Sequence, residues 1–238
     1  MAQVINTNVN ALFAGNALNK SAKGLLVAQE RLSSGLRINS AKDDATGMVI
    51  ASKYDTQIRG TNIAIRNAND SIAKAQTNDG YGAQIQENLQ RLNEIAVQLG
   101  GTASGAETTA LLAENARIAG LTTAATPTTV DGLGTTVTGA SLAIVPPVGV
   151  SVADIAKDIA SVTTDRANYG ADAVRFGSAV STMQITSVNL SSSFSRVMDT
   201  DYAAETASQS RNNILQQAGT AILAQANQNS QSVLQLLR

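Results

Sequence analysis

The chain of 238 residues contains no histidine, no cysteine and no tryptophan. These absences exclude His-dependent catalytic triads, zinc sites built from Cys and His, thiol nucleophiles and structural disulfides. Aromatic residues supply only 3% of the chain, which is very low for a conventional globular core. The plentiful Ala, Leu, Ile and Val side chains favour thin helical layers instead. Most hydrolases and metalloenzymes are thereby excluded, and we expect no enzyme activity, metal or cofactor.

Charge and long apolar runs are also scarce. The formal net charge of −1 gives no long-range attraction to nucleic acid or to an anionic membrane, and nearly neutral chains tend to self-associate. The first residues, MAQVINTNVNALFAGNALN, lack the basic and apolar regions of a Sec signal, and no stretch of about 18 apolar residues indicates a membrane span. Taken alone, this indicates a cytoplasmic protein, unless another route exports it.

The two ends of the chain carry almost no charge. Residues 1–19 and 212–237 contain no charged side chain and are rich in apolar and amide residues. Each end has a helical apolar stripe, through Leu18, Leu25 and Leu32 at one end and Leu215 and Ile222 at the other. Neither stripe has enough large apolar residues to keep an isolated helix folded. We therefore expect both ends to order only when they meet a partner.

A heptad pattern dominates the second half of the chain. Apolar residues recur at alternating steps of four and three, the spacing of helices that pack on other helices. The stripe consists of Ile155, Ile159, Val162, Arg166, Tyr169, Ala173, Phe176, Val180, Met183, Ser187, Leu190, Phe194 and Val197. At about 1.5 Å per residue this predicts a helix roughly 60 Å long.

The first half carries a matching pattern. The same spacing runs from Tyr54 to Ala75 and from Ile85 to Leu99, with an expected helix break at Gly80-Tyr81-Gly82 and an end at Gly100-Gly101. A shorter helix near Ile118 should fold back. Residues 121–150 are rich in Thr, Gly and Pro and predict one or two short β-hairpins. The expected fold is mainly α, a long antiparallel helical bundle or coiled-coil rod with these hairpins and two terminal helices.

Four long segments resemble bacterial flagellin. They are AQVINTNVNAL near the start, LSSGLRINSAKDDATGMVIA at 32–51, LQRLNEIAVQ at 89–98, and SRVMDTDYAAETASQSRNNILQQAGTAILAQANQNSQSVLQLLR at the end. The resemblance covers nearly the whole chain and implies a structural subunit that polymerises into the flagellar filament. It implies an inner terminal domain made of residues 1–44 and 196–238, and a helical rod domain of residues 45–195. Little lies between residues 121 and 150, so the outer variable domains of larger flagellins are expected to be absent.

The resemblance also implies partners and a location. Flagellins leave the cell unfolded through the flagellar type III channel, without a Sec signal, and add to an extracellular filament. The implied partners are other flagellin copies, the cap protein, the hook-filament junction proteins, an export chaperone at the C-terminal helix and the Toll-like flagellin receptor of animal hosts. No nucleic acid and no membrane insertion are expected. The alternative function is a hook-filament junction protein or another secreted flagellar coiled-coil protein.

Three groups of residues are predicted to carry these contacts. The subunit interface is predicted at Leu12, Leu18, Leu25, Arg31, Arg37, Lys42, Asp43, Asp44, Leu215, Ile222 and Leu236. By resemblance, the uncharged amides that would line the filament channel are Gln216, Gln217, Gln225, Gln228 and Gln231. The receptor contact implied by LQRLNEIAVQ comprises Gln90, Arg91, Glu94, Ile95 and Gln98, with Glu114 on the next helix. Simple subunit packing remains an alternative for the amides and for the receptor residues.

The window at 32–51 combines several charged and hydroxyl side chains. Gly35 should stop the first helix, and Ser40 to Asp43 is interpreted as a capping-box variant. Asp43 and Asp44 then place negative charge at the positive end of the next helix. No other acid, base or nucleophile type clusters with them, so we interpret the window as a joint, whose cations pair with acids such as Asp199 or Asp201 of adjacent subunits.

Overall fold

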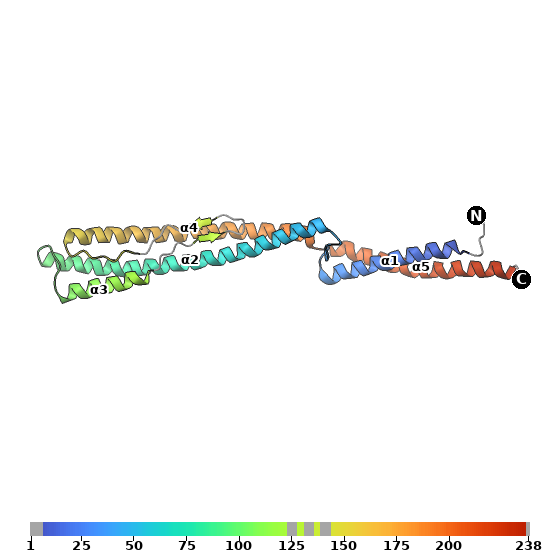
Figure 1. The fold of residues 1–238 in the computed structure, drawn as a ribbon, viewed down its shortest axis with the longest axis horizontal. Coiled ribbons are helices and arrows are strands. Elements are labelled where there is room, and N and C mark those ends of the chain that lie inside the picture. The colour runs from blue at the N-terminus through green and yellow to red at the C-terminus, as the bar shows by residue number, and fades with distance from the viewer. Residues whose placement is uncertain (1–6, 123–127, 131–135, 139–143, 237–238) are drawn as a thin grey trace. The chain divides into compact units, whose positions relative to one another are not determined.

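The computed structural model describes the backbone of residues 7–122, 128–130, 136–138 and 144–236, and the side chains of residues 7–122 and 144–228. In chain order the elements are α1 (Val9–Ser34), α2 (Ala45–Gln98), α3 (Ala106–Leu121), β1 (Thr128–Val130), β2 (Thr136–Thr138), α4 (Val152–Met198) and α5 (Tyr202–Leu236) (Figure 1). The fold is mainly α, as predicted. The chain forms two compact units, which we call unit 1 (Met1–Lys53 with Ser192–Arg238) and unit 2 (Tyr54–Ser191).

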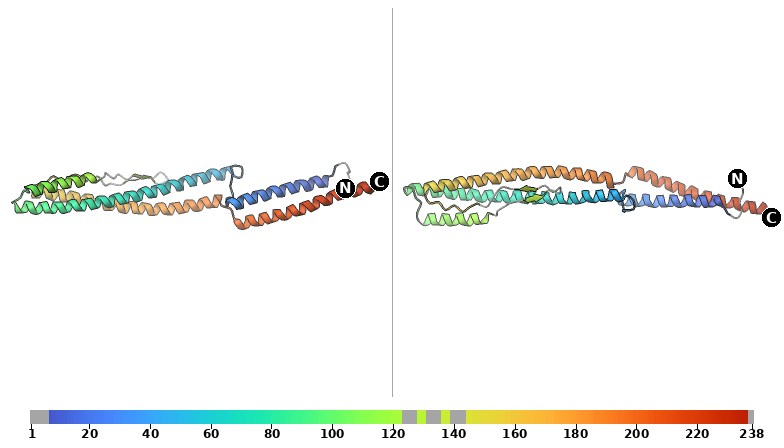
Figure 2. Two further views of the ribbon diagram at one scale, coloured as in Figure 1. Left: turned by 90° about the horizontal axis from the view of Figure 1, so that it is seen from below. Right: turned by 45° about the horizontal axis from the view of Figure 1, so that its top comes forward.

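Unit 2 is built on the long antiparallel helices α2 and α4, with α3 alongside α2 (Figure 2). Its larger core cluster gathers Ile85, Leu89 and Leu92 of α2 with Ile118 of α3 and Ile155 of α4. A second cluster packs Phe176 and Met183 of α4 against Ala64 and Ala68 of α2. The heptad stripe predicted for residues 155–197 is confirmed within unit 2, because Ile155, Val162, Tyr169, Phe176 and Met183 are all buried.

The predicted helix break at Gly80-Tyr81-Gly82 is wrong. Helix α2 runs without interruption from Ala45 to Gln98, and both glycines lie inside it. Isolated glycines cost a helix only about 1 kcal/mol each, which packing readily outweighs. Gly82 is buried against Arg166, so its place in the helix reflects a close approach of a side chain from α4.

The predicted end of α2 at Gly100-Gly101 is confirmed. Both glycines have positive φ, 82° and 123°, which residues with a β-carbon rarely adopt. The amide of Gly101 donates to the Ala96 carbonyl at 2.8 Å, as in a helix C-terminal cap. Just after this end, Thr102 forms an isolated β-bridge with Ser151, the residue before α4.

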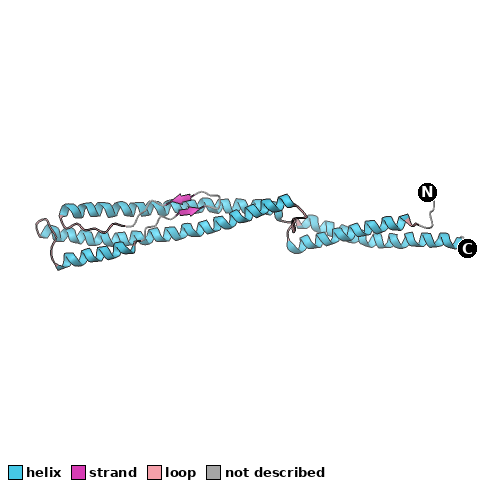
Figure 3. Ribbon diagram, viewed as in Figure 1, coloured by secondary structure: helices cyan, strands magenta, loops and turns pink. Residues whose placement is uncertain are grey.

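One antiparallel β-hairpin lies in the region predicted to contain one or two. Thr128 pairs with Thr138, Thr129 with Val137 and Val130 with Thr136. The two strands are magenta in Figure 3. Residues 131–135, which connect the two strands, lie outside the described residues. Pro147 and Gly149, in the segment that follows, are buried, and the Gly149 amide donates to Asp158 Oδ2 of α4 at 2.9 Å.

Unit 1 contains the antiparallel pair of α1 and α5. Asn8 Nδ2 near the start of α1 donates to the Ala226 carbonyl at 3.1 Å, and Arg31 near its end lies 3.6 Å from Glu205. Small residues let the helices approach: a β-carbon added to Gly24 would lie 2.9 Å from Asn212 Nδ2. One added to Gly219 would lie 3.3 Å from Leu18 Cδ1.

Candidate assembly interface

Helix α1 ends at Gly35, as predicted. Gly35 has φ 73°, and its amide donates to the Arg31 carbonyl at 2.8 Å. The Tyr202 hydroxyl donates to the Leu32 carbonyl at 3.4 Å and would lie 3.1 Å from a β-carbon at Gly35. The first residue of α5 therefore covers the end of α1. The left-handed backbone conformation favours glycine here, and the Tyr202 hydroxyl leaves little room for a β-carbon.

The connection from α1 to α2 and the connection from α4 to α5 lie side by side just after Gly35. Leu36 forms a β-bridge with Asp199. The Arg37 amide donates to the Met198 carbonyl at 2.6 Å, and the Thr200 amide donates to the Gly35 carbonyl at 2.9 Å. Arg37 Nη2 adds a hydrogen bond to the Val197 carbonyl at 2.8 Å. We call residues 35–51 and 194–205 the joint.

A small apolar core stabilises the joint. Ile38 is only 2% exposed and clusters with Ala51 of α2 and Met198 of α4. The partly buried residues around them are Leu36, Met48, Phe194 and Val197. Burial of these apolar side chains stabilises the joint in addition to its backbone hydrogen bonds.

The two adjacent aspartates have different roles. Asp43 Oδ2 accepts hydrogen bonds from the Ser40 hydroxyl at 3.0 Å and from the amides of Ser40 and Asn39 at 3.0 and 3.2 Å. These bonds, that from the Ser40 side chain above all, lower the pKa of the Asp43 carboxyl below its ordinary value. Asp44 Oδ1 instead accepts from the Gly47 amide at 2.8 Å at the start of α2.

The capping-box interpretation of Ser40 to Asp43 is therefore wrong in its details. The Asp43 amide donates to the Ser40 carbonyl at 3.0 Å, so these residues form a turn before the helix begins. The Asp43 carboxylate is already hydrogen-bonded within that turn, so Asp44 caps α2 instead. Negative charge does lie at the start of α2, as predicted.

Several charged residues of the joint, and Arg31 just before it, have partners within their own chain. Arg31 pairs with Glu205, a residue that the sequence analysis missed. Asp199 accepts a hydrogen bond from the Ser195 hydroxyl at 2.5 Å, and Asp201 Oδ1 caps α5 through the amides of Ala203 and Ala204. Lys42 is exposed. The pairing of Arg31, Arg37 and Lys42 with acids of adjacent subunits stays a prediction.

The α1 and α5 pair leaves most of its large apolar side chains in solvent. Leu12 is 63% exposed, Leu215 48% and Ile222 59%, whereas Leu18 and Leu25 are half-buried. Within α1 only Ala14 and Ala28 are buried, and no described side chain of α5 is. The side of α5 facing α1 includes Asn212 and Gly219, so the apolar stripe predicted for α5 lies beside the contact with α1 and not at its centre.

The predicted channel amides lie along α5. Gln216 is half-buried, whereas Gln217, Gln225 and Gln228 are exposed. The side chains of Gln231 and Leu236 lie outside the described residues. Their assignment to a channel and to an interface stays a prediction.

The predicted receptor contact forms a charged surface on α2 and α3. Arg91 Nε donates to Glu107 Oε1 at 3.0 Å, and its Nη1 donates to Glu94 Oε2 at 3.0 Å. These bonds, the one to Glu107 first, raise the pKa of Arg91. Gln90 and Gln98 are exposed, but Ile95 is only 8% exposed and lies in the core, away from a surface role.

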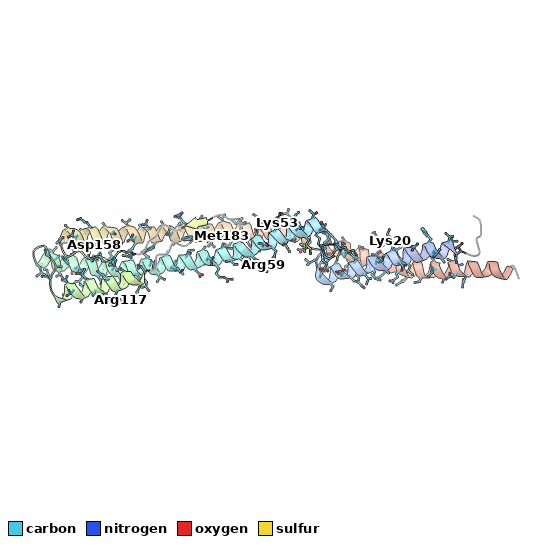
Figure 4. All side chains as sticks on the ribbon, in the orientation of Figure 1. Lys20, Lys53, Arg59, Arg117, Asp158 and Met183 are labelled. Carbon is cyan, nitrogen blue, oxygen red and sulfur yellow. The ribbon has the colours of Figure 1, made fainter. Side chains whose placement is uncertain are left out.

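Glu114 and Glu107 of α3 also belong to this charged surface. Glu114 pairs with Arg117 of its own helix at 2.6 Å, and hydrogen bonding to Arg117 lowers the pKa of the Glu114 carboxyl. Figure 4 labels Arg117 on α3. Glu107 was missed by the sequence analysis, because pairing across two helices leaves no local spacing signal.

Metal and membrane features were searched over the same described residues. No group of three or more acidic side chains there is arranged to hold a metal ion. None of the described helices is long and apolar enough to cross a bilayer.

Known proteins resemble the chain at both ends. The profile of the bacterial flagellin N-terminal helical region matches residues 5–133, and that of the C-terminal helical region matches residues 152–237. Flagellin of Salmonella muenchen is 54% identical over 115 residues, 48% of this chain and 23% of that protein. Flagellin of Salmonella rubislaw is 58% identical over 98 residues, 41% of this chain and 20% of that protein.

A third relative extends the same picture. Phase 2 flagellin of Salmonella typhimurium is 58% identical over 98 residues, covering 41% of this chain and 19% of that protein. The aligned part thus spans about a fifth of the length of these curated relatives. Because the N-terminal profile alone covers more than half of the 238 residues, and a second profile covers the C-terminal helices, the chain belongs to the bacterial flagellin family.

Proposed function

We propose that the chain is a structural subunit of an extracellular flagellar filament and that its activity is polymerisation rather than catalysis. The observation that carries the proposal is the α1 and α5 pair, which buries two alanines of α1 yet exposes Leu12, Leu215 and Ile222. Large apolar side chains left exposed on both helices of a pair favour an interaction site. Family membership supplies the rest of the support.

The polymer grows by a head-to-tail contact between different surfaces of each subunit. Repeating such a contact gives an open helical filament when the rotation does not close. We assign the contact to residues 1–44 and 196–238, the inner terminal domain, with residues 45–195 as the helical domain outside it. The apolar side chains of α1 and α5 become buried between copies, and that burial offsets the entropy of ordering the two helices.

Seeded growth tests the proposal directly. Purified full-length chain is added to short filament fragments and followed by electron microscopy. Elongation of the seeds supports a filament subunit. Protein that binds seed ends but never elongates them would instead support the alternative, a hook-filament junction protein or a related secreted coiled-coil protein.

The channel assignment follows from the uncharged C-terminal helix. Exposed Gln217, Gln225 and Gln228 offer hydrogen bonds without charge, so unfolded subunits would slide past them without electrostatic trapping. Type III export, the cap, the junction proteins and an export chaperone on α5 are the partners that this route requires. Replacing these glutamines by Lys should shorten filaments in cells while seeded growth in solution continues. Unchanged filament length in cells would refute the channel assignment.

Recognition by the host flagellin receptor is a separate proposal for the surface around Arg91. Its support is the exposed, charged arrangement of Arg91, Glu94 and Glu107 beside Gln90. A receptor-reporter cell assay on the parent protein and on Arg91→Ala tests it. Activity in the parent that Arg91→Ala lowers supports the proposal, and a silent parent protein ends it.

A further inference from the structure

Among the polar residues of the heptad stripe, Arg166 makes the most specific contacts. It lies one turn from Val162 and one turn from Tyr169, which are 2% and 1% exposed. An arginine between two buried stripe positions has to carry its charge out of the core, and its long apolar stem allows this. The α2 residues that face Arg166 therefore determine where its guanidinium group leaves the core.

Helix α2 offers Arg166 a close-fitting site at Gly82. A β-carbon added to Gly82 would lie 2.7 Å from Arg166 Cγ and 3.2 Å from its Cδ, so the stem lies directly on the helix backbone. From there Arg166 Nε donates to Asp79 Oδ1 at 2.8 Å, and Nη1 donates to Gln86 Oε1 at 2.7 Å. The two acceptors lie about one turn before and one turn after Gly82.

The neighbouring part of α2 does little to define an alignment. From residue 61 to residue 75 its buried positions are all small: Thr61, Ala64, Ala68, Ser71 and Ala75. Interlocking of large side chains is what normally distinguishes one heptad alignment from the next. The larger α2 residues that pack against the cluster of Phe176 and Met183, Ile65 and Ile72, are only partly buried. In this stretch a directional polar contact adds discrimination to the packing of the larger residues Ile85, Leu89 and Leu92 further along α2.

We propose that the contact of Arg166 with Gly82, Asp79 and Gln86 determines the longitudinal register of α4 on α2. In alignments displaced by one heptad, Arg166 would lie over Ala75 or Leu89, each of which has a β-carbon where the stem must pass. Gly82 alone combines the missing β-carbon with acceptors on both sides. A single polar residue in a helix seam can specify register in this way, at a cost in stability.

Disulfide trapping in the full chain measures the register, because the chain has no cysteine of its own. The native reporter is Asn62→Cys with Ser187→Cys, since Ser187 Oγ and Asn62 Oδ1 are 3.5 Å apart. The displaced reporters keep Ser187→Cys and use Asp55→Cys or Asn69→Cys, seven residues to either side. An offset of seven residues is about 10 Å along the helix, beyond the reach of a disulfide in the native register.

Two glycine substitutions form the matched test. Gly82→Ala places a methyl group against the Arg166 stem, whereas a β-carbon at Gly80 meets nothing within 4 Å. Both raise helix propensity equally. We expect Gly82→Ala and Arg166→Met to raise displaced cross-linking about tenfold, the effect of losing a charged hydrogen bond of ordinary strength. Gly80→Ala should leave cross-linking as in the parent protein.

The outcomes separate a register role from simple stability. Displaced cross-links within a monomer band in Gly82→Ala, but not in Gly80→Ala, support the proposal. Native cross-links alone in folded Arg166→Met overturn it, because apolar packing then suffices. Should Arg166→Met lose its helical circular dichroism signal, Gly82→Ala decides: cross-linking equal to that of Gly80→Ala overturns the proposal.

Discussion

Replacing Ile38 by Ala should weaken filament assembly without unfolding unit 2. Ile38 is 2% exposed in the joint core, and an Ile to Ala change in a core costs about 2–5 kcal/mol. Met48 and Met198 line the site, and their flexible side chains can partly fill the cavity. The structure therefore places the loss near the lower end of this range, at about 2–3 kcal/mol.

The assay is the critical concentration for seeded polymerisation. If the joint orders only on assembly, a loss of about 2–3 kcal/mol per subunit raises the critical concentration roughly 30- to 150-fold. Ile38→Val, which keeps most of the side chain, should raise it only about two- to tenfold. Hydrogen exchange of residues 54–191 serves as the control and should not change. A critical concentration for Ile38→Ala within about twofold of the parent's, as for a neutral surface change, would refute the coupling of the joint to assembly.

Three further predictions concern titration and ion pairs. Because the pKa of Asp43 is lowered in the folded state, its stabilising effect is present above the unfolded pKa of about 4 and is lost as pH falls through the folded pKa. The joint in parent filaments should therefore become sensitive to protease in acid. Asp43→Asn should remove that part of the pH dependence. Burial raises the pKa of Tyr169 to about 12. Absorbance titration should therefore show a tyrosine that deprotonates only near that pH, and Tyr169→Phe should remove this step. The free energy of unfolding should fall as pH rises from about 10 towards about 12. Arg91→Ala breaks exposed ion pairs, at least half in solvent, and should change urea-unfolding stability by less than about 1 kcal/mol; a larger loss would mean that the surface is structural.

The long helices of unit 2 could be predicted because their buried positions repeat with a regular period. Ile155, Phe176 and Met183 show this, since each lies at a step of the stripe and each is buried. Glycines inside a periodic segment are harder to interpret, because their cost is small and their benefit lies on another helix. Arg166 in the stripe was the available signal that something opposite had to be small. The continuous course of α2 through Gly82 follows from that contact.

The joint was only partly predictable for a similar reason. Gly35 as a helix end follows from local backbone preferences, and so does an acidic residue at the start of α2. The bridge between Leu36 and Asp199 and the pairing of Arg31 with Glu205 join residues far apart in the sequence, so no local spacing reveals them. The sequence of α5 also offers more than one helical face, and its apolar stripe does not indicate which face meets α1.

The short connection between α4 and α5 makes unit 1 sensitive to chain length rather than to residue type. Helix α4 ends at Met198 and α5 begins at Tyr202, and Asp199 between them is held by its bridge to Leu36. Each residue added or removed after that bridge would rotate α5 by about 100° about its own axis. The face carrying Asn212 and Gly219, which contacts α1, would then turn away from it. Single-codon insertions and deletions there should therefore abolish motility far more often than substitutions at the same positions.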